Sequence, residues 1–222
     1  MTGSNRLSRN TSLRAGRVYS VLKNNYPGAR TALKYSGDWQ LLVSVILSAQ
    51  CTDERVNKVT AGLFADHPDV SDYASMDPGY LESRVRSCGF FRNKARNIIE
   101  AAKLITEEYG GRVPDTMREM TRLPGVARKT ANVVLGNAYG VVEGIAVDTH
   151  VMRVSRRLGL TGHKDPVKIE KDLMRIFPRT KWFRLTYLFI EHGRAVCKAP
   201  VPLCSGCPVR ADCPREGVTR SR

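Results

Sequence analysis

The sequence predicts an all-α fold. Apolar residues recur every three or four positions over most of the chain, no segment alternates apolar and polar residues as strands do, and no internal repeat is present. A chain of 222 residues that is 42% hydrophobic and 26% charged is typical of a folded protein of one domain or two small ones. No apolar run approaches the roughly 20 residues of a membrane span, and none resembles a secretory signal, so we expect neither a membrane nor a secreted protein.

The chain is strongly basic. Its 36 Lys and Arg residues outnumber 21 Asp and Glu residues, and the net charge of +15 predicts a polyanionic partner. Residues 1–37 contain seven basic residues and no acidic one. Up to about Arg14 this arm is rich in Ser, Asn and Thr and lacks apolar periodicity, so we expect it to be disordered or loosely docked. A mitochondrial transit peptide has the same composition and is the alternative to the expected bacterial or archaeal cytoplasm.

Helices are predicted in order along the chain. An amphipathic helix with Val18 and Leu22 on its apolar face ends at Pro27. The segment 38–50 is apolar on all sides, which predicts a buried helix that anchors the core. Further helices are predicted at about 53–65, 78–86 and 92–109, and a pair of glycines closes the last of these.

A helix, a tight turn and a second helix are predicted between residues 116 and 138. Thr116 and Glu119 have the spacing of a capping box, which begins the first helix. Pro124 cannot continue that helix and Gly125 permits a positive φ, so a turn follows. The second helix, from about Val126 to Ala138, is predicted from residues that recur at helical spacing: Val126, Thr130, Val133, Val134 and Asn137.

The start of this second helix is a candidate phosphate-binding site. Its first backbone N–H groups have no partner within the helix, the helix dipole adds positive potential there, and Arg128 and Lys129 are adjacent. An ordinary αα-hairpin with a glycine turn has the same pattern. The net charge of the chain favours the sequence-independent contact with a nucleic-acid backbone.

Lys129 is a candidate nucleophile. The helix dipole, together with any partial burial, would disfavour its protonated form, and a neutral amine can form a Schiff base with a sugar aldehyde carbon. The helix carries the chain away over about 12 residues, and the extended segment 141–147 can run the same distance back, so Asp148 can return to Lys129. Asp148 is either only the N-cap of the next helix or also a carboxylate that stabilises an oxocarbenium-like sugar. For Lys129, the alternative is a solvated surface lysine or a plain phosphate contact.

Four cysteines lie close together near the end of the sequence. Their spacing, C-x6-C-x2-C-x5-C, predicts a metal site rather than disulfides in a chain that is not secreted. Zinc sites with four cysteines usually have two CxxC pairs, whereas this chain has one, which favours a [4Fe–4S] cluster over zinc. The remaining two, Cys51 and Cys88, are expected to be core residues. The predicted ligands are Cys197, Cys204, Cys207 and Cys213.

Together these motifs resemble the endonuclease III family of helix-hairpin-helix DNA glycosylases. The resemblance rests on LPGVARKTANVV, on VDTHVMR with its aspartate nineteen residues after the lysine, and on the cysteine spacing, and it extends from about residue 15 to Cys213. It implies a six-helix barrel domain at residues 31–141 and an iron–sulfur cluster domain at residues 142–222, with residues 1–30 packed against the cluster domain. It also implies a monomer that binds double-stranded DNA with a damaged base or an abasic site, and no membrane.

The resemblance also implies an activity. A bifunctional glycosylase and lyase of base excision repair would remove oxidised pyrimidines, with Lys129 attacking C1′ of a nucleotide flipped out of the duplex and β-elimination nicking the strand. Asp148 matches the catalytic aspartate of the family. Gln50 and Phe90 would fill the vacated stack, and His150 would contact DNA. The full set of implied DNA-binding residues is Gln50, Phe90, Gly125, Ala127, Arg128 and His150.

The sequence departs from the family pattern at two of these positions. Ala127 stands where the hairpin usually has a second glycine, and alanine tolerates a positive φ less well. Phe90 is larger than the usual wedge residue, which leaves the preferred lesion open. Two other functions stay open: a monofunctional adenine- or thymine-mismatch glycosylase, against which Lys129 argues, and a non-enzymatic iron–sulfur protein that binds DNA or senses oxidants.

Overall fold

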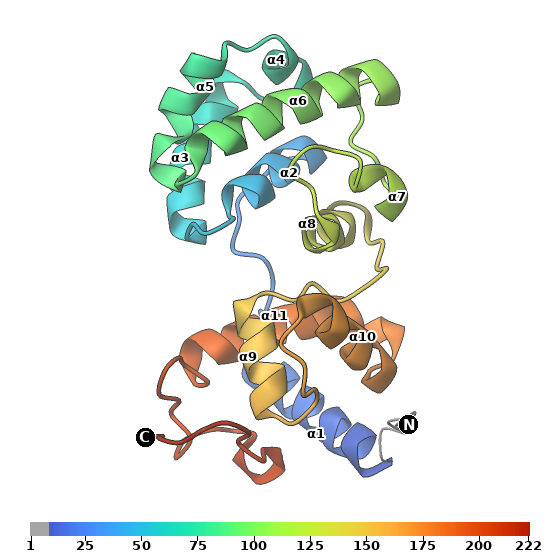
Figure 1. Cartoon of the computed structure of the whole chain (residues 1–222), viewed down its shortest axis with the longest axis vertical. Helices are drawn as coiled ribbons and strands as arrows, with labels where there is room; N and C mark the ends of the chain where they lie inside the picture. Colours follow the sequence, from blue (N-terminus) through green and yellow to red (C-terminus); the bar gives the residue numbers. More distant parts are fainter. Residues whose placement is uncertain (1–8) are drawn as a thin grey trace. The chain divides into compact units, whose positions relative to one another are not determined.

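Residues 9–222 of this computed structural model form helices joined by turns, and no strand occurs among them (Figure 1). Within the same residues, no helix is long and apolar enough to cross a membrane. Two compact units divide the chain: one contains the residues up to Thr31 together with Gly144–Arg222, and the other contains Ala32–Glu143. The first unit contains α1 (Arg9–Asn25), α9 (Thr149–Arg157), α10 (Pro166–Ile176), α11 (Arg179–Ala195) and the 3-10 turn η3 (Arg210–Asp212). The second contains α2 (Asp38–Leu47), α3 (Asp53–Asp66), α4 (Val70–Ala74), α5 (Pro78–Val85), the 3-10 turn η1 (Arg86–Cys88), α6 (Phe91–Tyr109), α7 (Met117–Met120), α8 (Arg128–Val134) and the π-helical turn η2 (Leu135–Tyr139).

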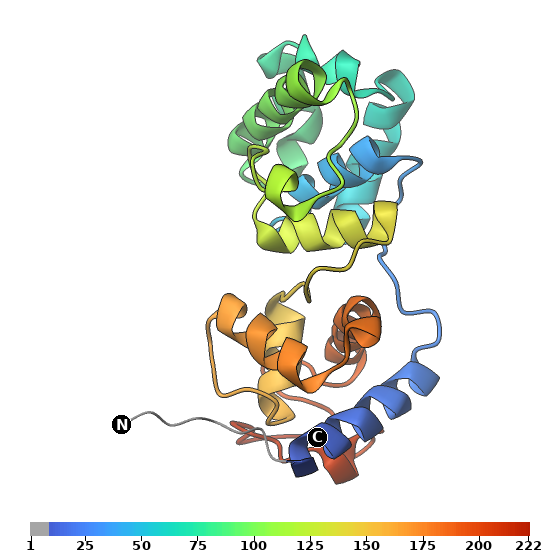
Figure 2. The ribbon, with the colours of Figure 1, turned by 90° about the vertical axis from the view of Figure 1, so that its right-hand side faces the viewer.

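Helix α2 is the centre of the unit Ala32–Glu143. Every residue from Leu41 to Leu47 is buried, which confirms the predicted core helix. The helices α3, α6 and α8 pack on it, and α4 and α5 pack on α6 (Figure 2). The helix ends at Leu47 rather than at Gln50, because Gln50 has a φ of 53° and a left-handed residue cannot continue a right-handed helix.

The ends of α6 and the start of α7 follow local sequence rules. After Tyr109, Gly110 and Gly111 both adopt a positive φ, of 58° and 79°, as predicted for the end of this helix. At α7, the Thr116 hydroxyl accepts a hydrogen bond from the backbone N–H of Glu119 at 3.3 Å and donates one to the Glu119 carboxylate at 2.7 Å. The predicted N-cap is therefore confirmed. In a full capping box the Glu119 side chain would accept from the backbone N–H of Thr116, whereas here it accepts from the Thr116 hydroxyl.

In the other unit, which contains α1 itself, helix α1 packs against α10, α11 and η3 (Figure 2). The prediction that the chain is disordered or loosely docked as far as Arg14 is wrong from Arg9 onward, because α1 begins there. Arg14 donates hydrogen bonds to the backbone oxygens of Leu158, Asp212 (3.0 Å) and Gly159 (3.2 Å). These partners lie more than 140 positions away in the sequence, so no local pattern reveals them. The first eight residues of the basic arm lie outside the described residues.

Candidate functional site

The predicted hairpin is the turn between α7 and α8. The N–H of Val126 donates to the carbonyl of Leu123 at 3.1 Å, and Gly125 has a φ of 77°. A Cβ atom added to Gly125 would lie 2.8 Å from Nδ2 of Asn97, a residue of α6. Both the backbone conformation and the available space therefore require glycine at this position.

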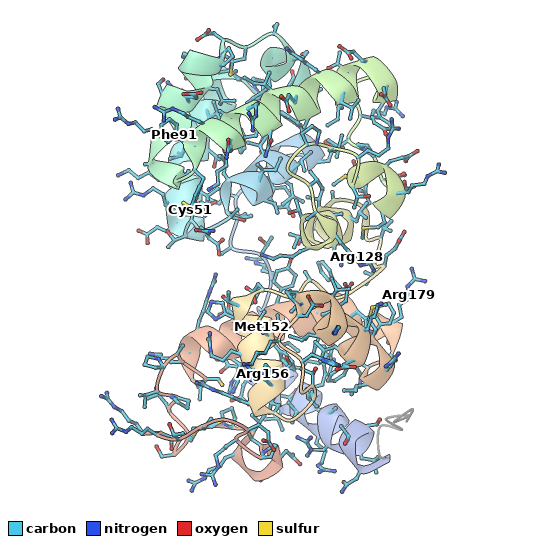
Figure 3. All side chains as sticks on the ribbon, in the orientation of Figure 1. Cys51, Phe91, Arg128, Met152, Arg156 and Arg179 are labelled. Atoms are coloured by element: carbon cyan, nitrogen blue, oxygen red, sulfur yellow. The ribbon has the colours of Figure 1, made fainter. Side chains whose placement is uncertain are left out.

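Helix α8 begins immediately after this turn. Its N-cap is Ala127, with a φ of −84° and a ψ of 168°. Because any L-residue adopts this conformation, alanine in place of a second hairpin glycine needs no change of the backbone. No side chain caps the first N–H groups of α8, and Arg128, which lies at the start of the helix in Figure 3, donates to the carbonyl of Glu143 at 3.2 Å.

The helix predicted from about Val126 to Ala138 is found as α8 and the π-helical turn η2 that continues it. Among the residues whose spacing predicts this helix, Val126 and Val134 are buried, Thr130 and Asn137 are half-buried, and the half-buried Val133 packs against the core. The buried face also contains Ala131, Asn132 and Leu135. Packing against α2 selects this face, and the π-helical turn that begins at Leu135 changes the spacing beyond it.

The two predicted catalytic residues lie in different units. Lys129 is in the first turn of α8 and its side chain is exposed, so the partial burial considered from the sequence is not found. Asp148 is half-buried, and its Oδ1 accepts a hydrogen bond from the N–H of Val151 at 2.8 Å. Asp148 is thus the N-cap of α9, as predicted. The meeting of Lys129 and Asp148 stays a prediction.

His150 follows Asp148 in the first turn of α9 and is held by an arginine. Nη2 of Arg153 lies 3.1 Å from Nδ1 of His150 and donates to the carbonyl of Gly193 at 3.0 Å, while Nε donates to the carbonyl of Cys197 at 2.9 Å. Because arginine only donates, Nδ1 accepts and the ring proton lies on Nε2. Burial lowers the pKa of His150, and the nearby carboxylate of Asp148 opposes that shift. The ring is therefore a neutral N–H donor at pH 7.

Gln50 and Phe90 share an uncommon backbone conformation. Both have a positive φ, of 53° and 46°, and both are exposed, with 65% of Phe90 accessible to solvent. A left-handed residue other than glycine costs about 1 kcal/mol or more. Gln50 lies just after α2 and Phe90 just before α6; their chain neighbours Cys51 and Phe91 are marked in Figure 3. Two exposed side chains on strained backbone are typical of a contact surface.

The four predicted metal ligands line a single cavity in the unit that contains α9 and α11. All six cysteines of the chain are free in the structure. Among residues 9–222, no three or more Cys, His, Asp or Glu side chains are arranged to hold a single metal ion. The donor set is nevertheless four thiols, the chemistry that soft metals and iron–sulfur clusters require. The cavity contains Cys197, Cys204, Cys207 and Cys213 together with Arg157, His192 and Val209.

Polar contacts surround this cavity. Arg157 donates to the carbonyls of Lys198 at 2.7 Å and Pro200 at 3.1 Å, and its Nη1 lies 3.5 Å from Sγ of Cys197. Burial raises the pKa of the Cys207 and Cys213 thiols. Thiolates at this place therefore need a compensating positive charge, which a metal centre supplies.

Comparison with known proteins decides the family. Residues 43–179 match the model of the HhH-GPD superfamily of base excision DNA repair proteins. Endonuclease III of Synechocystis sp. is 53% identical over 201 residues, which cover 90% of this chain and 92% of the relative. This chain belongs to the endonuclease III family. Two solved structures of endonuclease III with DNA, a non-covalent complex and a trapped covalent intermediate, each match it with a TM-score of 0.88 and 41% identity; they cover 92% of this chain, which covers 95% and 96% of theirs.

The predicted resemblance and the predicted helix-hairpin-helix glycosylase fold are thus confirmed. Within this endonuclease III family member, two arginines that hold the sites in place could not be found from the sequence. Arg153 fixes the ring of His150, and Arg157 holds the segment after Cys197. Apart from His150, the partners of these two arginines lie 40 or more positions away in the sequence. The spacing of residues along the chain therefore could not indicate their roles.

Proposed function

We propose that this chain is a bifunctional DNA glycosylase and lyase of base excision repair that removes oxidised pyrimidines from double-stranded DNA. One observation carries the proposal: Lys129 supplies an amine at the start of the hairpin helix, in a chain 41% identical to an endonuclease III that was trapped as a covalent intermediate with DNA. A covalent intermediate requires a nucleophile, and an amine forms one that borohydride can reduce.

Binding comes first in the proposed reaction. The hairpin residues Gly125, Ala127 and Arg128 contact backbone phosphates through N–H groups and positive charge, without reading sequence. C1′ is inaccessible inside a duplex, so the damaged nucleotide leaves the stack. Gln50 and Phe90 then occupy the vacated space, and His150 donates its Nε2 proton to DNA.

The covalent step follows. Nζ of Lys129 bonds to C1′ through its free electron pair and gives up a proton while the glycosidic bond breaks, and the base leaves with the bonding electrons and takes up a proton. The Asp148 carboxylate stabilises the positive charge that develops on the sugar as the base departs. Opening of the sugar ring gives a Schiff base. Removal of a proton from C2′ then expels the 3′ phosphate, which nicks the strand, and water releases Lys129.

We further propose that Cys197, Cys204, Cys207 and Cys213 hold a [4Fe–4S] cluster. Four thiols that line one cavity are the donor set that such a cluster requires, and these four side chains would hold it. The cluster supplies a structural cross-link that orders the segment after α11, and no step of base removal depends on it. Broad visible absorption with about four iron atoms per chain is expected. Stoichiometric zinc without iron would refute this assignment.

The proposed place of action is the chromosome in a bacterial cytoplasm. The Synechocystis relative is bacterial, and the proposed substrate is genomic DNA. A bacterial relative of this similarity favours this location over the archaeal and mitochondrial alternatives.

A strand-cleavage assay tests the proposed activity. A duplex with one oxidised pyrimidine is incubated with the enzyme, and half of each sample is then treated with hot alkali. A bifunctional enzyme nicks the strand without alkali, whereas a monofunctional glycosylase that releases the same base gives a nick only after alkali, and a mismatch glycosylase or a binding protein gives none in either half. The matched control is Lys103→Ala, which removes an exposed lysine of the same unit and should nick like wild type, whereas Lys129→Ala should not.

A further inference from the structure

Lys94 is a buried lysine that no step of the proposed reaction uses. It lies in α6 and only 5% of it is exposed, although lysines are rarely buried without a partner. Its Nζ donates to three backbone carbonyls, those of Leu47 at 2.8 Å, Ala49 at 2.6 Å and Cys88 at 2.6 Å. An ammonium group has three donors, so these three bonds use all of them.

The three carbonyls belong to two segments that are distant in sequence. Leu47 is the last residue of α2, where the helix dipole favours a cation, and Ala49 directly precedes Gln50. Cys88 ends η1, two positions before Phe90. One buried ammonium thus joins the two short segments whose tips are the exposed, left-handed residues Gln50 and Phe90.

The surroundings of Lys94 disfavour its charged form, so its ammonium group depends on the three carbonyls that it contacts. Burial lowers its pKa, while the neighbouring thiols of Cys51 and Cys88 act in the opposite direction. The charge is balanced by the three carbonyl dipoles, which lie within hydrogen-bonding distance of Nζ in this arrangement of the two segments. A residue other than glycine stays in the left-handed region only where its surroundings hold it there.

We propose that Lys94 is a positioning residue that fixes Gln50 and Phe90 relative to each other, so that both side chains can enter the stack vacated by a flipped nucleotide. The inference rests on the proposed function, which assigns those two residues to DNA. Two side chains that enter one gap must be placed together, and displacements of about 1 Å are enough to cost about a hundredfold in such sites.

The test compares Lys94→Met with Lys103→Met, the same substitution at an exposed position of α6. Affinity is measured for a duplex with a stable abasic-site analogue and for the undamaged duplex, and 2-aminopurine opposite the site reports insertion by fluorescence. For Lys94→Met, preference for the abasic duplex should fall by about tenfold or more and the fluorescence change should shrink, while affinity for undamaged DNA stays within about twofold. Lys103→Met should match wild type in every measurement.

A double-mutant cycle separates positioning from general destabilisation. In a Gln50→Ala/Phe90→Ala background, Lys94→Met should have no further effect on preference for the abasic duplex, because the residues through which it acts are gone. An additive loss would overturn the inference. If the Lys94→Met chain does not fold, Lys94→Gln, which keeps a shorter N–H donor group, is measured in the same way, and a smaller loss of the same kind is expected.

The two proposals fail differently. If wild type shows no preference for the abasic duplex and does not nick damaged DNA, the proposed function fails and this inference fails with it. If wild type prefers the abasic duplex and Lys94→Met prefers it equally, only the role of Lys94 is wrong.

Discussion

Replacing Asp148 by asparagine removes one negative charge and keeps the shape of the side chain. In the structure, Oδ1 of Asp148 accepts from the N–H of Val151 at 2.8 Å, and the amide oxygen of asparagine can accept the same bond. Asparagine and aspartate are equally good N-caps, so the change isolates the charge. Asp148→Asn therefore distinguishes a residue that only caps α9 from one that also stabilises a positive sugar.

The magnitudes differ enough to decide. Loss of the interaction between the carboxylate and the helix dipole costs about 0.3–1 kcal/mol of stability, which lowers the Tm of a chain of this size by at most about 4 °C. Loss of a charge that stabilises the transition state costs about 3 kcal/mol of activation free energy, or about a hundredfold in rate. Asp148→Ala should reduce the rate by the same factor as Asp148→Asn. Because alanine also removes the N-cap hydrogen bond, this variant should be about 1 kcal/mol less stable than Asp148→Asn.

The matched control is Asp165→Asn. Asp165 caps α10, and its Oδ1 accepts from the N–H of Lys168 at 2.9 Å, so this variant makes the same chemical change at another helix start. Base release is measured in a single turnover with enzyme in excess, and unfolding is followed by heat. Both variants should lose similar stability, and only Asp148→Asn should slow base release. A rate within about twofold of wild type would reduce Asp148 to a cap and refute its catalytic role.

Three further outcomes are expected from other parts of the structure. Gly125→Ala should weaken binding to undamaged duplex and lower stability by about 1 kcal/mol or more, because its φ of 77° and the Asn97 side chain exclude a Cβ, whereas Ala127→Gly should leave binding unchanged; a filter-binding series checks both. Arg157→Lys should release iron several-fold faster under a chelator than Arg156→Lys, because a single ammonium cannot span the carbonyls of Lys198 and Pro200; equal release rates would contradict this. Burial raises the pKa of Cys88 to about 11 from its ordinary 9.0, so the native state keeps a proton that the unfolded chain loses. Stability is therefore lost as pH rises from 9 to 11, by up to about 3 kcal/mol, and Cys88→Ala should lack this component in urea unfolding at the two pH values.

Features that depend on neighbouring residues in the sequence could be predicted. The end of α6 at Gly110, the N-caps Thr116 and Asp148, and the turn at Gly125 each follow from a residue type that satisfies the backbone locally. The four cysteines that share a cavity also lie within a short stretch, so their spacing alone indicated a joint site.

Features that depend on distant partners could not be predicted. Arg14 is held by the carbonyls of Gly159 and Asp212, which lie more than 140 positions away in the sequence, so composition did not indicate that α1 begins at Arg9. The buried face of α8 is selected by packing on α2 and includes Ala131 and Leu135, which the helical spacing in the sequence did not single out. Cys88 is a core residue as expected, but Cys51 is only half-buried, and Lys94 beside them has no sequence signal that separates it from a surface lysine.

Borohydride trapping tests the central claim that Lys129 bonds covalently to the sugar. A duplex with one oxidised pyrimidine is incubated with wild type, Lys129→Ala or Lys103→Ala in the presence of borohydride, and the products are separated on a denaturing gel. The account predicts a protein–DNA band for wild type and Lys103→Ala and none for Lys129→Ala. A band of equal intensity for Lys129→Ala, or no band for wild type, would contradict it.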